Sequence, residues 1–321
     1  MKKELLHIFG HQISKGESAK LSFSVAKLHT QNSIDIPVII ERSRQEGPTV
    51  LITAGIHGDE VNGVEVVRQL IAKGINKPKR GTIICIPLIN VYGFLRMNRE
   101  FPDGRDLNRV FPGSKTGSLA SRVAYKLMKE IIPKIDLAID FHTGGASRFN
   151  APQIRITDEP PYFTELAKVF GAPFIVYSKH KKKTFRNACQ QQGIPILLFE
   201  GGKSFYIDKN ITNTAVNGVK RFLHHQGMLR TTFKVNKPKQ NPVKIKQSKW
   251  IRAKHSGMFT SSVRLSTFVE KGSVLGNITD PYGNFNHFIK APNSGFIFNI
   301  NESPMIYQGD AIFHISLKTE P

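Results

Sequence analysis

Histidine and acidic residues gather at two points of the sequence, each at the end of an apolar segment. His57 and Glu60 lie in TAGIHGDEVNGVEVV, and His142 lies in LAIDFHTGG. A histidine and a glutamate in one turn can point at one ion, and a third protein ligand leaves the fourth position of a catalytic zinc site open. Asp140, two residues before His142, could orient a ligand histidine. The sequence therefore predicts a Zn2+ site formed by His57, Glu60 and His142.

A purely structural explanation competes with this metal site. Glu60 opens a predicted helix, where a carboxylate interacts favourably with the helix dipole, and His57 could be an ordinary turn histidine. For His57 and Glu60 alone we would prefer that explanation. The placement of His142 at the end of a second predicted strand favours the metal site instead.

Glu200 follows the apolar segment IPILLF and precedes two glycines. A carboxylate at the end of an apolar strand must be paired, associated with a metal or exposed by the turn. This placement suits a general base that takes a proton from zinc-bound water. Metal ligands and such a base together predict metal-assisted hydrolysis.

The segment NVYGFLRMNREFPDGRDLNRVFPG, between the first two ligand segments, is rich in asparagine, arginine and glycine. Arginine binds carboxylates through two parallel hydrogen bonds, and asparagine can both donate and accept. We therefore expect Arg99, Asn108 and Arg109 to bind an acidic substrate. The alternative is a structural loop in which Asp106 and Arg109 pair with each other.

The elements that must position these residues alternate between strands and helices. Short apolar segments predict strands at residues 34–42, 49–55, 82–90, 137–144, 174–178 and 194–202, and helical spacing predicts helices at 60–72 and 119–132. Such alternation is typical of an α/β domain, which we place at residues 1–228, with a mostly parallel mixed sheet flanked by helices. Glycine-punctuated strand signals at 229–321 predict a small all-β domain similar to a barrel-sandwich hybrid, with a basic linker at its start.

Composition limits the class of protein. The 321 residues carry a net charge of +22, with nine Lys or Arg and no acid between residues 229 and 254. Few aromatic residues interleave with that charge, so we do not expect nucleic-acid binding, and a small anionic substrate fits better. Cys85 and Cys189 are too few for a disulfide framework or a cysteine zinc site. Without a long apolar run or a signal-like N-terminus, we expect no membrane association and a cytoplasmic location.

Four blocks in this order, GIHGDE, PDGRDLNRVFPG, DFHTG and FEGG, resemble the succinylglutamate desuccinylase/aspartoacylase family, a branch of the zinc carboxypeptidase-like fold. The resemblance covers residues 48–205. It implies the same three zinc ligands, with Glu200 as the base that activates water. It also implies that Asn108 and Arg109 bind substrate, that Arg99 matches an upstream substrate arginine, and that Arg186 binds a carboxylate. Arg109 is also expected to stabilise the oxyanion, and the C-terminal β domain to cover the mouth of the site.

These expectations lead to a zinc-dependent amidohydrolase that cleaves an N-acyl amino acid or a similar small carboxylate substrate. Two alternatives stay open. One is a zinc carboxypeptidase acting on a peptide, and the other is a basic nucleic-acid-binding protein on a hydrolase scaffold. A homo-oligomer is compatible with the sequence, and the acyl group and the amine are open.

Overall fold

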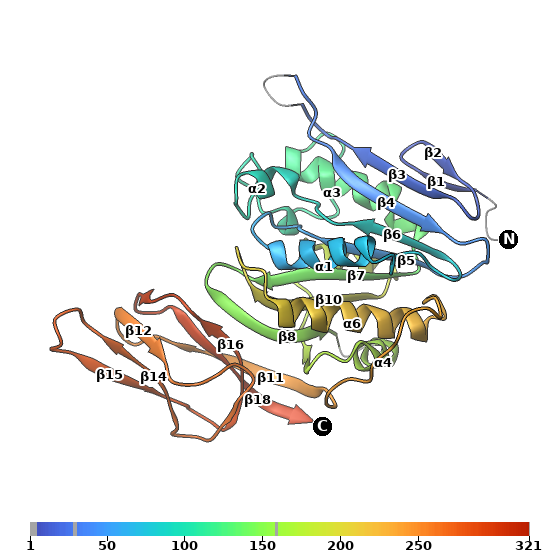
Figure 1. Ribbon diagram of the computed structural model, residues 1–321. Helices are drawn as coiled ribbons and strands as arrows, with labels where there is room; N and C mark the ends of the chain where they lie inside the picture. The colour runs from blue at the N-terminus through green and yellow to red at the C-terminus, as the bar shows by residue number, and fades with distance from the viewer. Residues whose placement is uncertain (1–4, 28–30, 158–159, 321) are drawn as a thin grey trace.

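The computed structural model describes residues 5–27, 31–157 and 160–320 (Figure 1). A mixed sheet of 12 strands runs through the molecule in the order β13-β16-β18-β11-β9-β8-β10-β7-β5-β6-β4-β3. Its strands are β3 (Ser18–Phe23), β4 (Ile36–Arg42), β5 (Thr49–Ala54), β6 (Thr82–Ile86), β7 (Leu137–Gly144), β8 (Arg148–Ile156), β9 (Phe174–Tyr177), β10 (Ile196–Lys203), β11 (Val243–Arg252), β13 (Phe268–Val269), β16 (Gly295–Asn301) and β18 (Ala311–Glu320).

The sheet combines parallel and antiparallel strand pairings. Parallel pairings join β6, β5, β7 and β10 at the centre, and β8, β9 and β11 beside them. Antiparallel pairings join β3 with β4, β4 with β6, and β10 with β8, and they also join β11, β18, β16 and β13 in that order. The predicted mixed α/β sheet is therefore confirmed, but the description as mostly parallel holds only for its central strands.

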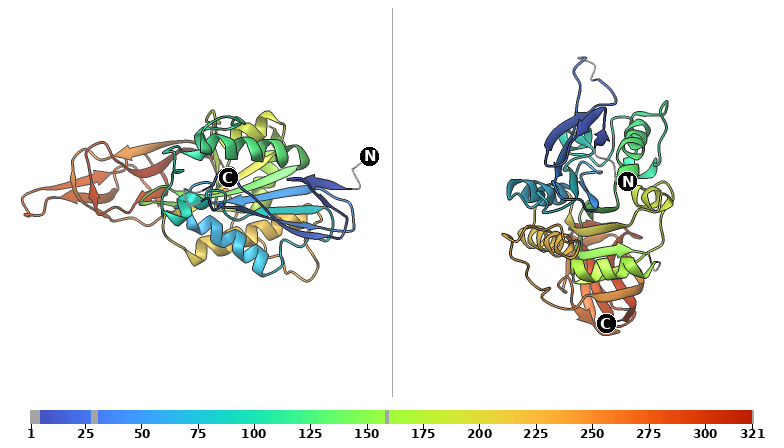
Figure 2. Two further views of the ribbon diagram at one scale, coloured as in Figure 1. Left: turned by 90° about the horizontal axis from the view of Figure 1, so that it is seen from above. Right: turned by 90° about the vertical axis from the view of Figure 1, so that its right-hand side faces the viewer.

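Helices pack on both faces of this sheet and enclose two apolar cores (Figure 2). The first core contains residues of α1 (Val61–Ala72), α4 (Pro161–Phe170) and α6 (Lys209–His225), and the second contains residues of α3 (Leu119–Glu130) and α5 (Phe185–Gln191). Neighbouring residues of β7 alternate between them, since Ile139 packs in the first core and Ala138 in the second. Because side chains alternate along a strand, Asp140 and His142 share the face of Ala138.

The C-terminal residues form the predicted β domain, which projects from one end of the sheet (Figure 1). A second sheet of four strands, in the order β15-β14-β12-β17, packs on β16 and β18 through a separate apolar core. Its strands are β12 (Gly257–Ser261), β14 (Val274–Thr279), β15 (Asn286–Lys290) and β17 (Met305–Ile306).

This β region is joined to the α/β region through the large sheet itself. The start of β11 pairs in parallel with β9, and β16 pairs with β8 from Asn299 to Asn301. The basic segment that we expected to be a linker therefore contains β11. Shared strands satisfy backbone groups that a free sheet edge would leave unpaired, so the boundary at residue 228 separates two regions of one continuous sheet.

The remaining elements are a hairpin of β1 (Leu6–Ile8) and β2 (His11–Ile13), the short helix α2 (Val91–Leu95) and the 3-10 turns η1 (Leu107–Arg109) and η2 (Ile132–Lys134). Within the described part of the chain, no helix has the length and apolarity needed to cross a bilayer. The carboxyl ends of β5, β7 and β10 meet at one edge, where open α/β sheets collect ligands.

Candidate active site

Three buried side chains converge at this edge. His57 Nδ1 lies 2.6 Å from Glu60 Oε1, and His142 Nδ1 lies 3.1 Å from Glu60 Oε2. Their candidate ligand atoms all fall within 4.8 Å of one another. Two imidazole nitrogens and one carboxylate form a donor set that suits Zn2+. The cluster can therefore hold a metal ion, and it consists of the three residues that the sequence predicted.

The chain between β5 and α1 bends sharply to bring two of these ligands together. Gly55 has a positive φ of 62°, and a Cβ at Gly58 would lie 2.0 Å from the carbonyl carbon of Gly93. Glu60 precedes α1 but makes no side-chain capping hydrogen bond. Its Oε2 instead accepts a hydrogen bond from the backbone N–H of Thr143. Glu60 lies at the N-terminus of α1, as the dipole explanation requires, but its carboxylate also contacts both histidines of the cluster, which that explanation does not account for.

Each histidine of the cluster has a second carboxylate at its other ring nitrogen. Asp140 Oδ2 lies 2.8 Å from His142 Nε2, and Asp106 Oδ1 lies 3.2 Å from His57 Nε2. Thr53 donates a hydrogen bond of 2.7 Å to Asp140. Such carboxylates orient the imidazole of a metal-binding histidine and raise its basicity. The position expected for Asp140 is confirmed, whereas Asp106 was not anticipated in this role.

Negative charge dominates the cluster itself. Burial disfavours the charged imidazole of His142, yet Asp140 and Glu60 raise its pKa well above the ordinary value. Burial also opposes ionisation of Asp106, but His57 and Arg99 hold the pKa of that carboxyl well below its usual range. Carboxylates that stay ionised beside buried imidazoles are the surroundings in which a divalent cation is favourable.

Arg99 contacts the cluster directly. Its guanidinium lies 3.2 Å from Glu60 Oε1 and 3.0 Å from Asp106 Oδ2. The alternative pairing of Asp106 with Arg109 is wrong, since Asp106 pairs with Arg99 and His57 and Arg109 bonds to the carbonyl oxygen of Asn108. Arg99 lines the site as expected and is held there by two carboxylates.

Glu200 lies on β10 in register with His142 on β7. Residues in register on neighbouring strands point to the same face, so the carboxylate stands beside the cluster. Glu200 Oε2 accepts a hydrogen bond of 2.8 Å from Asn150 Nδ2, and Glu200 Oε1 lies 3.8 Å from Arg155 Nε. The first oxygen is held by the protein, whereas the second lies beyond hydrogen-bond distance of that guanidinium.

The other predicted residues line the same cavity. Asn108 Oδ1 accepts the backbone N–H of Phe185, and the exposed Arg109 donates to the carbonyl oxygen of Asn108. Arg186 is buried at the start of α5, where it donates to the hydroxyl and carbonyl oxygens of Ser178. Burial and the nearby Arg155 lower the pKa of Arg186 to about 10, so its guanidinium stays charged at neutral pH.

These residues surround a site cavity of about 800 Å³, with the metal cluster on one wall. Basic side chains line much of it: Arg99, Arg109, Arg148, Arg155, Lys179, Lys181, Arg186 and Arg252. Trp250, Arg252 and Asn299 come from the C-terminal β region. The β region therefore forms part of the wall, and the end of the basic segment 229–254 reaches the site.

Sequence reasoning missed four residues near the base: Asn150, Arg155, Trp250 and Asn299. The first two lie on β8, whose sequence RFNAPQIRI contains a proline and four polar residues and gave no strand signal. The positions of Trp250 and Asn299 at the site depend on pairing between distant strands, β11 with β18 and β16 with β8. Tyr282 and Tyr307 of the C-terminal β region are exposed and do not line the cavity.

Comparisons with known proteins relate the chain to a family and to solved structures. The family description "Succinylglutamate desuccinylase/Aspartoacylase catalytic domain" matches residues 46–226. The N-alpha-acetyl-L-2,4-diaminobutyric acid deacetylase of Halomonas elongata is 28% identical over 258 residues, which are 77% of this chain and 75% of that protein.

Solved structures share the fold over almost the whole chain. The product-bound ectoine utilization protein EutE (DoeB) of Ruegeria pomeroyi has a TM-score of 0.85 at 21% identity, covering 99% of this chain and 100% of that one. A succinylglutamate desuccinylase from Silicibacter sp. TM1040 has a TM-score of 0.82 at 23% identity, with 95% of each chain covered. With the family match extending over more than half of its length, this chain belongs to the succinylglutamate desuccinylase/aspartoacylase family.

Proposed function

We propose that the protein is a zinc-dependent deacylase that hydrolyses the amide bond of an N-acyl amino acid or a similar small carboxylate substrate. The observation that carries this proposal is the buried cluster of His57, Glu60 and His142 beside Glu200, in a cavity lined by arginines. Membership of a family of amide-bond deacylases supports it. The proposal includes a zinc carboxypeptidase-like arrangement of sheet and helices and a cytoplasmic enzyme.

His57, Glu60 and His142 would hold the ion, and Asp106 and Asp140 would fix the two imidazoles. Zinc, when bound, polarises the scissile carbonyl and makes a water molecule more acidic. In this scheme Glu200 accepts the proton of the attacking water and later gives a proton to the leaving amine. The hydrogen bond from Asn150 holds Glu200 Oε2, which leaves Oε1 for the proton transfer.

The arginines divide the work of binding. Arg186 is buried and charged, and among the described residues its hydrogen bonds go to Ser178 and to the carbonyl oxygen of Lys179, so its charge suits a substrate carboxylate. Arg109 is exposed at the cavity and would stabilise the oxyanion. Asn108 and Arg99 would complete the substrate contacts, with Arg99 also tied to the ligand Glu60.

Cavity size favours a small substrate over a peptide. A volume of about 800 Å³ lies within the usual range of small-molecule sites, about 300–1,000 Å³. Trp250 and Arg252 of the C-terminal β region form part of its lining. The volume of the cavity therefore favours a small N-acyl substrate, and the dipeptide controls described below test the carboxypeptidase alternative.

The test is metal analysis of purified protein followed by a substrate panel. We expect about one zinc per chain and release of free amine from N-acetyl or N-succinyl amino acids. The panel includes N-acetyl-2,4-diaminobutyrate, because a relative deacetylates it, and unacylated dipeptides as carboxypeptidase controls. Release of amino acids from the dipeptides alone would contradict the proposal.

A further inference from the structure

We infer that Asn299, in the C-terminal β region, is a positioning residue for the base, and that it acts through Asn150. The inference rests on the proposed function, because it takes Glu200 as the group that moves the proton. Asn299 Nδ2 donates a hydrogen bond of 2.5 Å to Asn150 Oδ1, and Asn150 Nδ2 donates one of 2.8 Å to Glu200 Oε2. Two hydrogen bonds thus connect the β region to the base.

Backbone pairing brings these three residues together. Glu200 lies on β10 and Asn150 on β8, whose strands pair antiparallel, and Asn299 on β16 is in register with Asn150. The two hydrogen bonds therefore cross from the α/β region to the β region at the point where their strands pair. A side chain on β16 can reach the base only because the two regions share one sheet.

The chemistry of the groups fixes the orientation of both amides. An ionised carboxylate only accepts hydrogen bonds, so Asn150 must turn its NH2 group toward Glu200. Its carbonyl oxygen then faces Asn299, which must present its own NH2 group. Reversing either amide would place two acceptors or two donors face to face.

Asn299 is buried at a cost that the fold alone does not explain. Its side chain is 2% exposed, and its Oδ1 has no hydrogen-bond partner within the described part of the chain. A buried polar atom without a partner is destabilising. The register partner of Asn299 is His314, whose ring stacks on Trp250 with centroids 4.3 Å apart. The ring of His314 also packs on Phe298 of β16, with centroids 4.3 Å apart, so rings from β11, β18 and β16 pack together beside Asn299.

The consequence for catalysis is a fixed carboxylate. With Oε2 held by Asn150, rotation of Glu200 is restricted and Oε1 keeps its direction toward the reacting water. Loss of Asn299 should leave substrate binding intact and slow the proton transfer, because Asn150 can then rotate away from the base. Asn299 itself touches neither the water nor the amide bond in this scheme.

The test compares Asn299→Ser with Asn301→Ser on the most rapidly cleaved N-acetyl or N-succinyl amino acid. Serine at 299 is too short to reach Asn150, so the variant loses the hydrogen bond between the two side chains. We therefore expect kcat to fall about tenfold, in line with the loss of one hydrogen bond, while KM is unchanged. Asn301 lies on the same strand and bonds to the carbonyl oxygen of Ala311 instead. Its variant should stay within about twofold of wild type. Asn299→Leu repeats the test if the serine variant does not fold.

A double-mutant cycle distinguishes positioning from general structural support. If Asn299 acts only through Asn150, then Asn150→Ala lowers kcat and adding Asn299→Ser lowers it no further. Multiplied losses in the double variant, or a rise in KM with kcat unchanged, would overturn the inference.

Side-chain amide NMR separates this inference from the proposed function. In protein labelled with 15N at asparagine, the Asn150 NH2 signals should move in both Glu200→Gln and Asn299→Ser, with zinc content unchanged. If the Asn150 NH2 signals did not move in Asn299→Ser, the inference would be overturned and the proposed function would stand. Signals that move while Glu200→Gln remains fully active would show that Glu200 is not the base, and would overturn both.

Discussion

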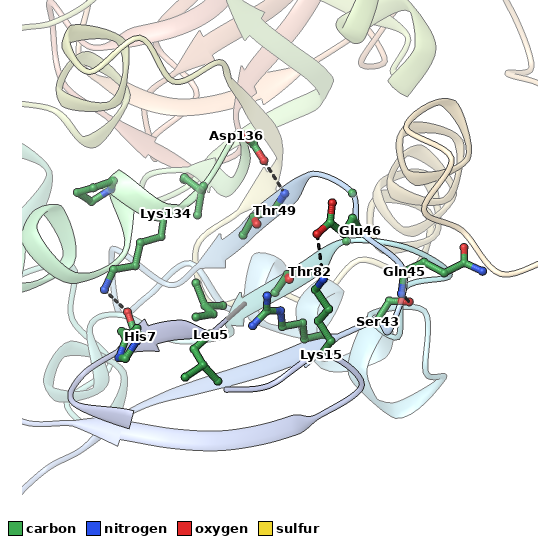
Figure 3. Close-up of a pocket in the computed structure, with 16 residues that line it drawn as sticks. Leu5, His7, Lys15, Ser43, Gln45, Glu46, Thr49, Thr82, Lys134 and Asp136 are labelled. Atoms are coloured by element: carbon green, nitrogen blue, oxygen red, sulfur yellow. Dashed lines mark hydrogen bonds and ion pairs between the residues drawn. The ribbon is translucent and has the colours of Figure 1, made fainter. Parts of the chain in front are cut away.

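The same parallel strands have a cavity at each end, and the two cavities use their charges differently. The site cavity lies beyond the carboxyl ends of β5, β7 and β10. The opposite cavity, of about 360 Å³, lies where β5 and β6 begin, and its lining includes Lys15, Glu46, Thr49, Thr82 and Asp136 (Figure 3).

In the opposite cavity the protein satisfies its own charges. Lys15 Nζ lies 2.9 Å from Glu46 Oε1, and Asp136 Oδ2 accepts the backbone N–H of Thr49 at 2.8 Å (Figure 3). Lys134 Nζ lies 3.9 Å from Glu130 Oε2 and donates to the carbonyl oxygen of His7. In the site cavity, the described residues give Arg186 hydrogen bonds to hydroxyl and carbonyl oxygens and no ion pair. Arg186 therefore differs from Arg99 in the same cavity, which two carboxylates hold, and its guanidinium can bind a substrate carboxylate.

The metal cluster provides the sharpest test of this comparison. His57→Ala or His142→Ala removes one of three ligands, so we expect zinc to be lost and activity to fall to background. Zinc per chain by elemental analysis is the measurement, with His225→Ala, on the surface of α6, as the control. Full zinc in both ligand variants would place the metal elsewhere.

Removal of the base should have the next largest effect. Glu200→Gln keeps the shape, and its amide oxygen can still accept the hydrogen bond from Asn150, but the amide cannot accept a proton from water. We expect zinc to be retained and kcat to fall by about 10²–10⁴-fold, the usual contribution of general acid–base catalysis. Glu302→Gln, which removes a surface partner of Lys203, serves as the control. A Glu200→Gln enzyme within twofold of wild type would exclude the assigned role.

The buried arginine should affect acidic substrates selectively. A charge-assisted hydrogen bond contributes about 1.5–3 kcal/mol, so Arg186→Ala should reduce kcat/KM by roughly 10- to 150-fold on a carboxylate substrate. The carboxamide analogue should be affected little, and zinc should stay bound. Equal losses on both analogues would mean that Arg186 supports the structure or the transition state. Thermal melting of the variant checks that its fold is intact.

The carboxylates behind the histidines should have a smaller effect, and the two should resemble each other. Asp106→Asn and Asp140→Asn each remove the charge that orients one imidazole, and such changes typically cost about 10–100-fold in metal affinity or activity. Competition with a zinc chelator measures the affinity. If only Asp140→Asn weakened binding, the contact of Asp106 with His57 would be incidental to the metal.

The metal wall of the site could be predicted because its chemistry is local in the sequence. His57 and Glu60 share one turn, and His142 and Glu200 each end an apolar segment, so residue type and element type point to the same edge. Burial was also foreseeable, since β5 and β7 are apolar strands covered on both faces.

The wall formed by β8 and the C-terminal β region could not be predicted, because it depends on pairing between distant strands. Asn150 and Arg155 lie on β8, where a proline and four polar residues without regular alternation conceal the strand. Asn299 reaches the base only through the pairing of β16 with β8. Separating the chain at residue 228 into two independent regions concealed that contact, whereas a shared sheet creates it.

We expect the smallest effect from a substitution in the opposite cavity. A large effect there would contradict the comparison between the two cavities. Lys15→Ala removes the ion pair with Glu46, whose side chains are 37% and 58% exposed. Exposed ion pairs contribute about 0.2–1 kcal/mol because solvent screens them, so the free energy of unfolding should fall by no more than that. Activity and zinc content should be unchanged, in contrast to Arg186→Ala, which also removes one cation from a cavity wall. Chemical denaturation and kcat/KM on the same substrate measure both variants side by side. If Lys15→Ala reduced kcat/KM as strongly as Arg186→Ala, Lys15, which pairs with Glu46, would matter to substrate binding as much as Arg186. The distinction between the two ends of the sheet would then fail.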